Sequence, residues 1–343
     1  MASGRPARPH TSTPAPEDVA PPTVSDDAIP GTVVRAYGKF FTVQLDDGRE
    51  LLSTVKGGLK RRRWGTDLVA VGDQVQVTDV GEGEGRIEYV APRRSALSRL
   101  ARHTGDVEQV ILANPDQALF LFAVREPEPH PRLLDRFLVM AESRGLPALI
   151  GVNKMDLDGP GPHGEPSLAR TIFADYEPIY PMFYLSVKTG AGLEALRAAL
   201  AGKVTAVAGP SGVGKSSLLN VFDPERERAV GAISEATGKG RHTTIGTVLH
   251  RIPGDEVTYV ADTPGIRALS LQGVDLDHLD QLYPEMRPYL NQCRYADCTH
   301  LHEPGCAIQE AVTEGHISPE RYASYARLRR GEGDEGVRVP GSP

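Results

Sequence analysis

Alternating apolar and polar positions characterise the chain between residues 30 and 92. Five short runs have this period of two, with Val and aromatic residues at many of the alternate positions. Turn signals such as Asp-Asp-Gly lie between the runs, which read GTVVRAYG, KFFTVQLDDG, RELLSTV, DQVQVTDV and GRIEYVAP. This pattern predicts five short antiparallel strands, each with one buried face. So many strands in so short a stretch are typical of a small closed barrel.

A different pattern follows, from about residue 114 to residue 271. Here short apolar runs with the length of buried strands alternate with longer stretches of helical spacing. The apolar runs are ALFLFAV, LPALIGV, PMFYLSV and KVTAVAG, and the helical stretches are PRLLDRFLVMAESRG, SLARTIFADY, GLEALRAALAG and GKSSLLNVF. Strands that alternate with helices predict a parallel sheet covered by helices, so the expected fold class is α/β.

The remaining stretches complete a division into domains, of which 343 residues allow two or three. Residues 1–29 and 331–343 have the composition of a disordered leader and tail. Residues 274–330 are mostly helical around a cysteine cluster, and Ser318-Pro319-Glu320 is a start signal for the last helix. We expect an oligonucleotide-binding (OB) barrel at 30–92 and the α/β domain at 93–273, although an SH3-like barrel would give almost the same pattern.

The composition is that of a globular protein, with 40% hydrophobic and 24% charged residues and a net charge of −7. No apolar run approaches the roughly 20 residues that a membrane helix needs, so we expect no membrane partner. The first residues lack the apolar core of a secretory signal, and Glu17 and Asp18 make a transit peptide the less favoured interpretation. The cytoplasm is the expected location.

Positive charge is nevertheless concentrated in one region. Between Gly31 and Gly105 there are thirteen Lys and Arg against nine Asp and Glu, a local excess of 13 − 9 = 4. Much of it lies in KGGLKRRR and RRSALSRLAR. Such clusters on an acidic protein are common at phosphate contacts, and solvated surface loops are an equally good explanation.

The stretch GPSGVGKSS, residues 209–217, matches G-x-x-x-x-G-K-[ST] and follows a predicted strand. In this context the loop predicts a phosphate-binding site, in which backbone N–H groups hold a β-phosphate. Lys215 would reach the β and γ phosphates, and the Ser216 hydroxyl would bind Mg²⁺. The expected nucleotide contacts are Gly209, Pro210, Ser211, Gly212, Val213, Gly214, Lys215, Ser216 and Ser217.

Two further motifs select the base. NKMD follows the apolar strand LPALIGV and matches N-K-x-D, and SVK follows PMFYL and matches S-A-K. The Asp156 carboxylate can accept from both donors of guanine, whereas adenine would leave it buried and unpaired. Asn153 would tie this loop to the phosphate loop. The expected guanine contacts are Asn153, Lys154, Met155, Asp156, Ser186, Val187 and Lys188.

DTPG, residues 262–265, follows another strand and matches D-x-x-G. Asp262 would hold Mg²⁺ through water, and the Gly265 N–H would sense the γ-phosphate. The polar, Gly-rich segment 225–247 has the composition of a switch loop that a ligand orders. We assign Mg²⁺ to Ser216 and Thr244, with Thr243 as the open alternative, and count both threonines among the GTP contacts.

The order of these motifs is unusual. GTPases ordinarily begin with the phosphate loop and end with NKxD and SAK, whereas here NKMD and SVK come first. This order predicts a circularly permuted P-loop GTPase domain, in which the former chain ends are joined through GLEALRAALAG. Position 266, where many GTPases have a glutamine that orients the attacking water, is Ile266. His242 is the best internal candidate for that role, although a solvated loop residue is equally consistent with the sequence.

The three cysteines lie within CRYADCTHLHEPGC. An odd and clustered set in a cytosolic chain favours a metal site over disulfides. Cys293, Cys298, His300 and Cys306 suit tetrahedral Zn²⁺ in a closed, structural site. His302 is an alternative to His300, and three buried free cysteines remain the simpler alternative.

As a set, these features closely resemble the ribosome small-subunit-dependent GTPase A family, also called RsgA or YjeQ. NKMD, SVK, GPSGVGKSS, GRHTT, DTPG and CTHxxEPGC stand in the order of that family, over residues 30–330. The resemblance implies that the barrel and the zinc domain contact the small (30S) ribosomal subunit and its rRNA. It also implies GTP hydrolysis that is stimulated by the subunit during its late maturation, with His242 as a catalytic residue and an aliphatic residue normal at position 266. The long leader, and HTTIG where a third threonine is frequent, are departures from the family.

Two other functions remain as alternatives. The first is an RNA-binding switch in which GTP holds a conformation and hydrolysis has little role. The second is a P-loop ATPase or kinase, against which NKMD argues. We expect GTP and GDP as ligands, one Zn²⁺, Mg²⁺ with GTP, and a monomeric chain.

Overall fold

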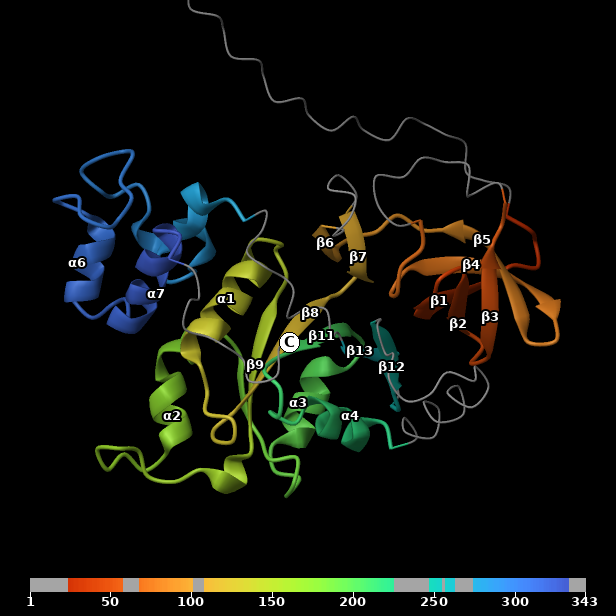
Figure 1. Ribbon diagram of the computed structural model, residues 1–343, viewed down its shortest axis with the longest axis horizontal. Coiled ribbons are helices and arrows are strands. Elements are labelled where there is room, and N and C mark those ends of the chain that lie inside the picture. Colours follow the sequence, from red (N-terminus) through yellow and green to blue (C-terminus); the bar gives the residue numbers. More distant parts are fainter. Residues whose placement is uncertain are drawn as a thin grey trace, which may run out of the picture.

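The computed structural model describes residues 24–57, 68–100, 108–224, 247–254, 257–262 and 274–332. Three parts follow one another along the chain, namely a barrel, a sheet covered by helices, and a mostly helical domain (Figure 1). No helix within these ranges is long and apolar enough to cross a lipid bilayer.

The five predicted strands of the first part form a closed barrel in the order β1-β2-β3-β5-β4. Their bounds are β1 (Ile29–Tyr37), β2 (Phe40–Leu45), β3 (Glu50–Val55), β4 (Gln74–Gly81) and β5 (Glu84–Val90). One detail of the prediction was wrong, because β3 and β5 pair in parallel while the other neighbours are antiparallel. An alternating pattern reports which face is buried but not which strand lies alongside. The observed order is that of an OB-fold.

The second part is a six-stranded sheet in the order β10-β9-β8-β11-β13-β12. All neighbours are parallel except β12, which is antiparallel to β13. The strands are β8 (Gln117–Ala123), β9 (Ala148–Asn153), β10 (Met182–Tyr184), β11 (Val204–Ala208), β12 (Val248–Ile252) and β13 (Thr258–Asp262). The helices between them are α1 (Pro131–Glu142), α2 (Leu168–Phe173), α3 (Leu193–Leu200) and α4 (Lys215–Phe222), with short 3₁₀ turns η2 (Met155–Leu157) and η3 (Ala174–Tyr176).

The central strand β8 explains why the sheet needs helices on both faces. Phe120 and Phe122 pack into the cluster that α1 and α2 cover, whereas Leu119 and Leu121 pack into the cluster that α3 and α4 cover. Every residue of β8 is buried. A strand buried on both sides reads as a continuous apolar run, and ALFLFAV has that form.

A two-stranded sheet that the pattern did not predict joins the barrel to the larger sheet. It consists of β6 (Ala96–Leu100) and β7 (Glu108–Ala113). The Ala113 backbone amide donates to the Val71 carbonyl at 2.8 Å, and the Asn114 side-chain amide donates to the Gly72 carbonyl at 3.0 Å. These bonds attach the barrel to the start of the α/β domain.

The third part contains 3₁₀ helices and two short α-helices around its own core. They are η5 (Leu276–Leu282), η6 (Arg287–Tyr289), α6 (Ala307–Thr313) and α7 (Pro319–Arg329). The Ser318 hydroxyl accepts from the amides of Glu320 and Arg321, so this residue caps α7 as predicted. Val139 of α1 belongs to the same apolar cluster, which therefore extends to the α/β domain.

Candidate functional site

The guanine and phosphate motifs all follow the carboxyl ends of parallel strands. NKMD follows β9, SVK follows β10, the phosphate loop follows β11, and Asp262 ends β13. Because β10, β9, β8, β11 and β13 are parallel neighbours, these ends lie along one edge of the sheet. Asp262 is in register with Val207 of β11, two residues before the phosphate loop. We call this row of loops the nucleotide edge.

Asn153 connects three loops of the nucleotide edge. Its side-chain amide donates to the Val213 carbonyl of the phosphate loop at 2.8 Å. Its side-chain oxygen accepts from the Val187 amide of the SVK loop at 3.0 Å. Asn153 is only 2% exposed, and its bond to Val213 is buried while its bond from Val187 is partly buried. One buried side chain thus holds the phosphate loop and both guanine loops at a fixed separation.

The phosphate loop needs glycine where it passes closest to its neighbours. Gly209 and Gly214 have φ angles of 154° and 98°. A Cβ at Gly209 would lie 2.0 Å from the Leu121 carbonyl oxygen, and one at Gly214 would lie 2.4 Å from the amide nitrogen of Asn153. The loop turns back over itself, and the Lys215 ammonium donates to the carbonyls of Gly209 and Pro210 at 2.8 and 2.6 Å. Helix α4 then starts at Lys215, so its positive end faces the loop.

Asp156 lies beside the SVK loop. Its carboxylate accepts from the Ser186 hydroxyl at 2.7 Å, and the Lys188 ammonium lies 3.5 Å from its second oxygen. The Ser186 hydroxyl, with help from Lys188, holds the pKa of Asp156 below its ordinary value. A carboxylate that stays ionised at neutral pH can accept from two donors on one ligand edge.

No local pattern in the sequence predicts one wall of the nucleotide edge. The loop between β8 and α1 brings the Glu126 carbonyl to the Lys154 ammonium, which donates to it. Pro127 of the same loop faces the phosphate loop, since a Cβ at Gly212 would lie 3.6 Å from its Cδ. The loop after β8 lies between NKMD and the phosphate loop because β8 lies between β9 and β11 in the sheet.

The remaining predicted residues of the nucleotide site are not described. His242, Thr243, Thr244 and Gly265 lie outside the described residues, as does Ile266. Their roles stay predictions.

The four predicted metal ligands converge in the C-terminal domain. One donor atom from each of Cys293, Cys298, His300 and Cys306 lies within 4.8 Å of all the others. Nδ1 of His300 is 3.5 Å from the Cys293 sulfur and 3.4 Å from the Cys306 sulfur, and these two sulfurs are 3.9 Å apart. The edges of a tetrahedral sulfur site with 2.3 Å bonds are about 3.8 Å long, so the donor set can hold a metal ion of that geometry. His302, the alternative ligand, is exposed.

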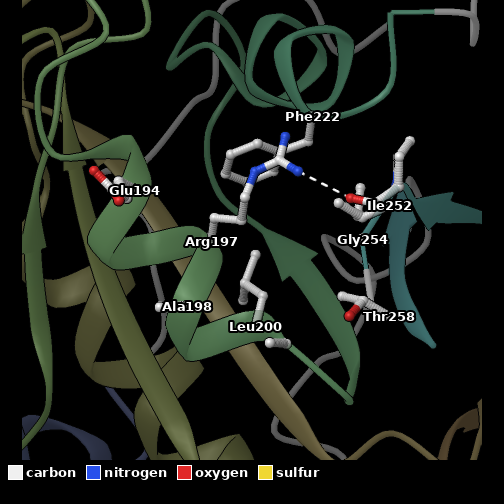
Figure 2. A pocket seen from close by; sticks show the side chains of 10 residues that line it. Glu194, Arg197, Ala198, Leu200, Phe222, Ile252, Gly254 and Thr258 are labelled. Carbon is white, nitrogen blue, oxygen red and sulfur yellow. Dashed lines mark hydrogen bonds between the residues drawn. The ribbon is translucent and has the colours of Figure 1, made fainter. Parts of the chain in front are cut away.

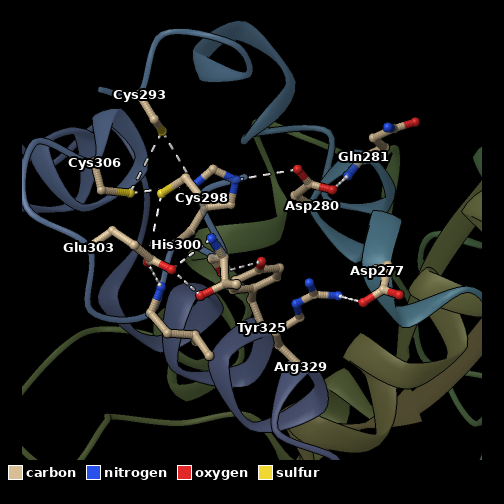
Figure 3. Close-up of polar contacts among 12 residues, drawn as sticks. Asp277, Asp280, Gln281, Cys293, Cys298, His300, Glu303, Cys306, Tyr325 and Arg329 are labelled. Atoms are coloured by element: carbon tan, nitrogen blue, oxygen red, sulfur yellow. Dashed lines mark hydrogen bonds and ion pairs between the residues drawn. The ribbon is translucent and has the colours of Figure 1, made fainter. Parts of the chain in front are cut away.

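Two carboxylates support this cluster (Figure 3). Asp280 lies 3.3 Å from Nε2 of His300 and so orients the ring with Nδ1 toward the sulfurs. Glu303 accepts from the amide and the hydroxyl of Thr299 and from the amides of Leu301 and His302. Burial opposes ionisation of Glu303, but these bonds hold the pKa of its carboxyl well below the usual range. Glu303 is part of the EPGC sequence, and its hydrogen bonds to the loop were not anticipated.

A separate cavity of about 320 Å³ lies at the amino ends of β11 and β13, away from the nucleotide edge (Figure 2). Leu200, Phe222 and Ile252 give it an apolar lining. Arg197 of α3 stacks on the Phe222 ring, with 5.1 Å from guanidinium to ring centroid, and donates to the Pro253 carbonyl at 3.0 Å. Arg197 therefore holds the helix of the permutation junction to α4 and to the turn between β12 and β13.

Comparisons with known proteins agree with this architecture. A family model described as RsgA GTPase matches residues 90–272. A small ribosomal subunit biogenesis GTPase RsgA from Gemmatimonas aurantiaca is 43% identical over 302 residues, which make up 87% of this chain and 96% of the relative.

Two solved structures extend the likeness to the fold. The crystal structure of YjeQ from Thermotoga maritima aligns with a TM-score of 0.71 and 31% identity, over 89% of this chain and 98% of that one. The structure of YloQ, described as a circularly permuted GTPase, aligns with a TM-score of 0.69 and 26% identity, over 91% and 98% of the two chains. The predicted fold class and the resemblance are confirmed, and this chain belongs to the RsgA GTPase family.

Proposed function

We propose that this chain hydrolyses GTP in the late maturation of the small ribosomal subunit, and that the subunit stimulates hydrolysis. The observation that carries the proposal is the pair of hydrogen bonds that the Asn153 side chain makes, one donated and one accepted, which join NKMD, SVK and the phosphate loop in one edge. The family, and relatives named small ribosomal subunit biogenesis GTPases, support the same function.

Guanine binds between NKMD and SVK in this proposal. Asp156 accepts from the two donors of the guanine edge, a backbone N–H of the SVK loop meets the guanine oxygen, and the Lys154 stem lies along the base. The ionised state of Asp156 and the tether from Lys154 to the Glu126 carbonyl support these roles. Adenine would leave the carboxylate without its partners.

The phosphates bind over the loop at residues 209–217. Lys215 would exchange its two loop carbonyls for phosphate oxygens, and the amino end of α4 favours the same negative charge. Ser216 and Thr244 would hold Mg²⁺, with Asp262 beside them through water and Gly265 at the γ-phosphate. The ion supplies charge neutralisation between the phosphates. The register of Asp262 with Val207 supports its part in this set.

Hydrolysis requires a group that orients the attacking water. Because Ile266 cannot do so, we assign the role to His242, in a geometry that the small subunit completes. Slow turnover by the chain alone follows from this assignment.

In the C-terminal domain, Cys293, Cys298, His300 and Cys306 hold one structural Zn²⁺ in this proposal. All four ligands come from the protein, so no open position remains for catalysis. The ion would stabilise a domain whose own core is small.

The barrel supplies an rRNA contact. Phe40 and Leu52 lie on the outward side of β2 and β3 and are 51% and 47% exposed, and Lys39 and Lys56 stand at the ends of these strands. This face of an OB-fold binds oligonucleotides, and exposed aromatic rings stack on unpaired bases. We propose a monomer that works in the cytoplasm, where ribosomal subunits are its partners.

Steady-state GTP hydrolysis tests the proposal directly. We expect slow release of phosphate by the chain alone, a large increase with purified small ribosomal subunits, and none with large subunits. Tight GTP binding without stimulation would favour the alternative of a passive RNA-binding switch.

Replacement of Asp156 by Asn tests the choice of base. The amide can donate where the carboxylate accepted, so preference should move from GDP toward xanthosine diphosphate by about 10²-fold or more. Competition between the two nucleotides measures this, with Thr189→Val in the neighbouring exposed loop as control. An unchanged preference for GDP would contradict the assignment of NKMD.

A further inference from the structure

Helix α1 begins at the wall of the nucleotide edge. The Val124 amide donates to the Asn153 carbonyl at 3.0 Å, the Glu126 carbonyl accepts from Lys154, and Pro127 faces Gly212. Only three residues separate Pro127 from the first residue of α1. A displacement of α1 therefore acts, over only three residues, on the segment that binds Lys154 and faces Gly212.

The other side of α1 is attached to the C-terminal domain, which lies against it (Figure 1). Val139 packs in the apolar cluster of that domain. Asp135 pairs with Arg321 of α7, and Glu142 pairs with Arg287 at 2.5 Å. One helix is thus shared between the nucleotide edge and the domain that carries the metal cluster.

The contact between Asp135 and Arg321 is part of a buried group of charges, which we call the Arg321 triad: Asp135, Glu285 and Arg321. Nε of Arg321 donates to Glu285 at 2.7 Å, and Nη1 donates to Asp135. The side chains of Arg321, Asp135 and Glu285 are 2%, 4% and 9% exposed. Burial lowers the pKa of Arg321, but the two carboxylates outweigh burial and raise it, so the guanidinium stays charged.

Aromatic rings from both domains enclose this arginine. Its guanidinium lies 5.2 Å from the ring centroid of Tyr176 in the α/β domain and 4.7 Å from that of Tyr283 in the C-terminal domain. The Tyr176 hydroxyl donates to Asp135 at 2.8 Å, which orients that carboxylate toward Arg321. The triad is therefore a buried, partnered group of charges, unlike an exposed surface ion pair, which contributes little.

From this geometry we propose that the Arg321 triad couples the nucleotide edge to the docking of the C-terminal domain, with α1 as the shared rigid element. The inference rests on the proposed binding of guanine nucleotide. Docking holds α1 and the wall at Glu126 and Pro127 in place, so it favours nucleotide binding. By reciprocity, bound nucleotide favours docking to the same extent.

The charges make the coupling sensitive to a single side chain. Asp135 and Glu285 are buried carboxylates on opposite sides of the domain contact, and Arg321 is the cation between them. Without Arg321 the docked arrangement would bury two like charges, which is strongly unfavourable, whereas separation of the domains exposes both to water. Loss of Arg321 should therefore undock the C-terminal domain while the sheet stays folded.

Equilibrium titration with fluorescent GDP tests the proposal on the full-length, metal-loaded chain. We expect Arg321→Met and Asp135→Asn each to raise the Kd for GDP by about 2- to 30-fold. The double variant should not exceed the larger single effect by much, because both changes break one contact. Arg329→Met is the matched control, since Arg329 lies on the same helix and pairs with Asp277 within the C-terminal domain. Its Kd should equal that of the unaltered chain.

Hydrogen exchange provides a second measurement that needs no variant. In the unaltered chain, saturating GDP should slow amide exchange in α7, far from the nucleotide edge, and the effect should vanish in Asp135→Asn. Two outcomes would overturn the coupling alone. One is amide exchange in α7 that does not change when GDP is added, and the other is an equal Kd for GDP in folded Arg321→Met and in Arg329→Met. Failure of the unaltered chain to bind GDP would overturn the proposed function and the coupling together.

Discussion

The metal cluster and the nucleotide edge are assembled in opposite ways. All four donor atoms of the cluster come from residues 293–306, and the carboxylate of Glu303, in the same stretch, binds the loop amides between them. The nucleotide edge takes its residues from loops after β9, β10 and β11, between residues 153 and 217, and from Asp262. A short loop can build a closed metal site by itself, whereas a large polyvalent ligand needs loops that only a sheet brings together.

The two sites therefore depend on different parts of the molecule. The cluster depends on its own ligands and on two neighbouring carboxylates, so damage to it should stay within the C-terminal domain, apart from any effect that passes through α1. The nucleotide edge depends on one buried side chain, Asn153, that touches two distant loops. Three substitutions put this difference to the test.

The largest effect is expected at the cluster. Cys298→Ser removes a thiolate ligand, so the bound metal should fall from about one ion per chain to a small fraction of that. The C-terminal domain should become sensitive to protease while the sheet remains resistant. Metal analysis and limited proteolysis measure both quantities. His302→Ala is the control, and loss of metal from this variant would mean that His302 rather than His300 is the ligand.

The next largest effect is expected from Asn153→Ala, and this effect should extend over more of the chain. The substitution leaves the Val213 carbonyl and the Val187 amide without their buried partner, at a cost of about 2–6 kcal/mol in stability of the α/β domain. GDP binding should fall with it, because the phosphate and guanine loops lose their fixed separation. Denaturant unfolding and GDP titration measure these changes. A variant with normal affinity would show that the sheet alone positions the loops.

The smallest effect is expected from pH. A carboxylate whose pKa is lowered in the folded protein makes its full favourable contribution at pH values above its ordinary pKa of about 3.9. That contribution is lost as the pH falls through the lower pKa of the folded state. The contribution of Asp156 to GDP affinity should therefore be the same at pH 8 and at pH 5. In Ser186→Ala, which removes the main cause of the depressed pKa, the acid loss of affinity should begin at higher pH. Coincident pH profiles of the two proteins would contradict the role of the Ser186 hydroxyl.

Several parts of the fold followed from local pattern. The five alternating runs became the five strands of the barrel, and Ser318 caps α7. The run ALFLFAV became a strand buried on both faces. The parallel pairing of β3 with β5, the small sheet of β6 and β7, and the antiparallel direction of β12 were not predicted. Each concerns which strand lies beside which, and burial patterns along one strand do not encode its neighbour.

The sequence by itself determined the chemistry of this protein, because both sites are written in short motifs whose residue types have few other uses. Guanine and phosphate recognition is predicted from NKMD, SVK and GPSGVGKSS, and three cysteines and a histidine form a group that can hold a metal ion. The tertiary structure decided how those motifs are held: Asn153 on Val213, Glu126 beside Lys154, and Asp135 against Arg321. Partners so far apart in the sequence carry no local signal, because their contact exists only after the sheet has ordered its strands and the C-terminal domain has packed on α1.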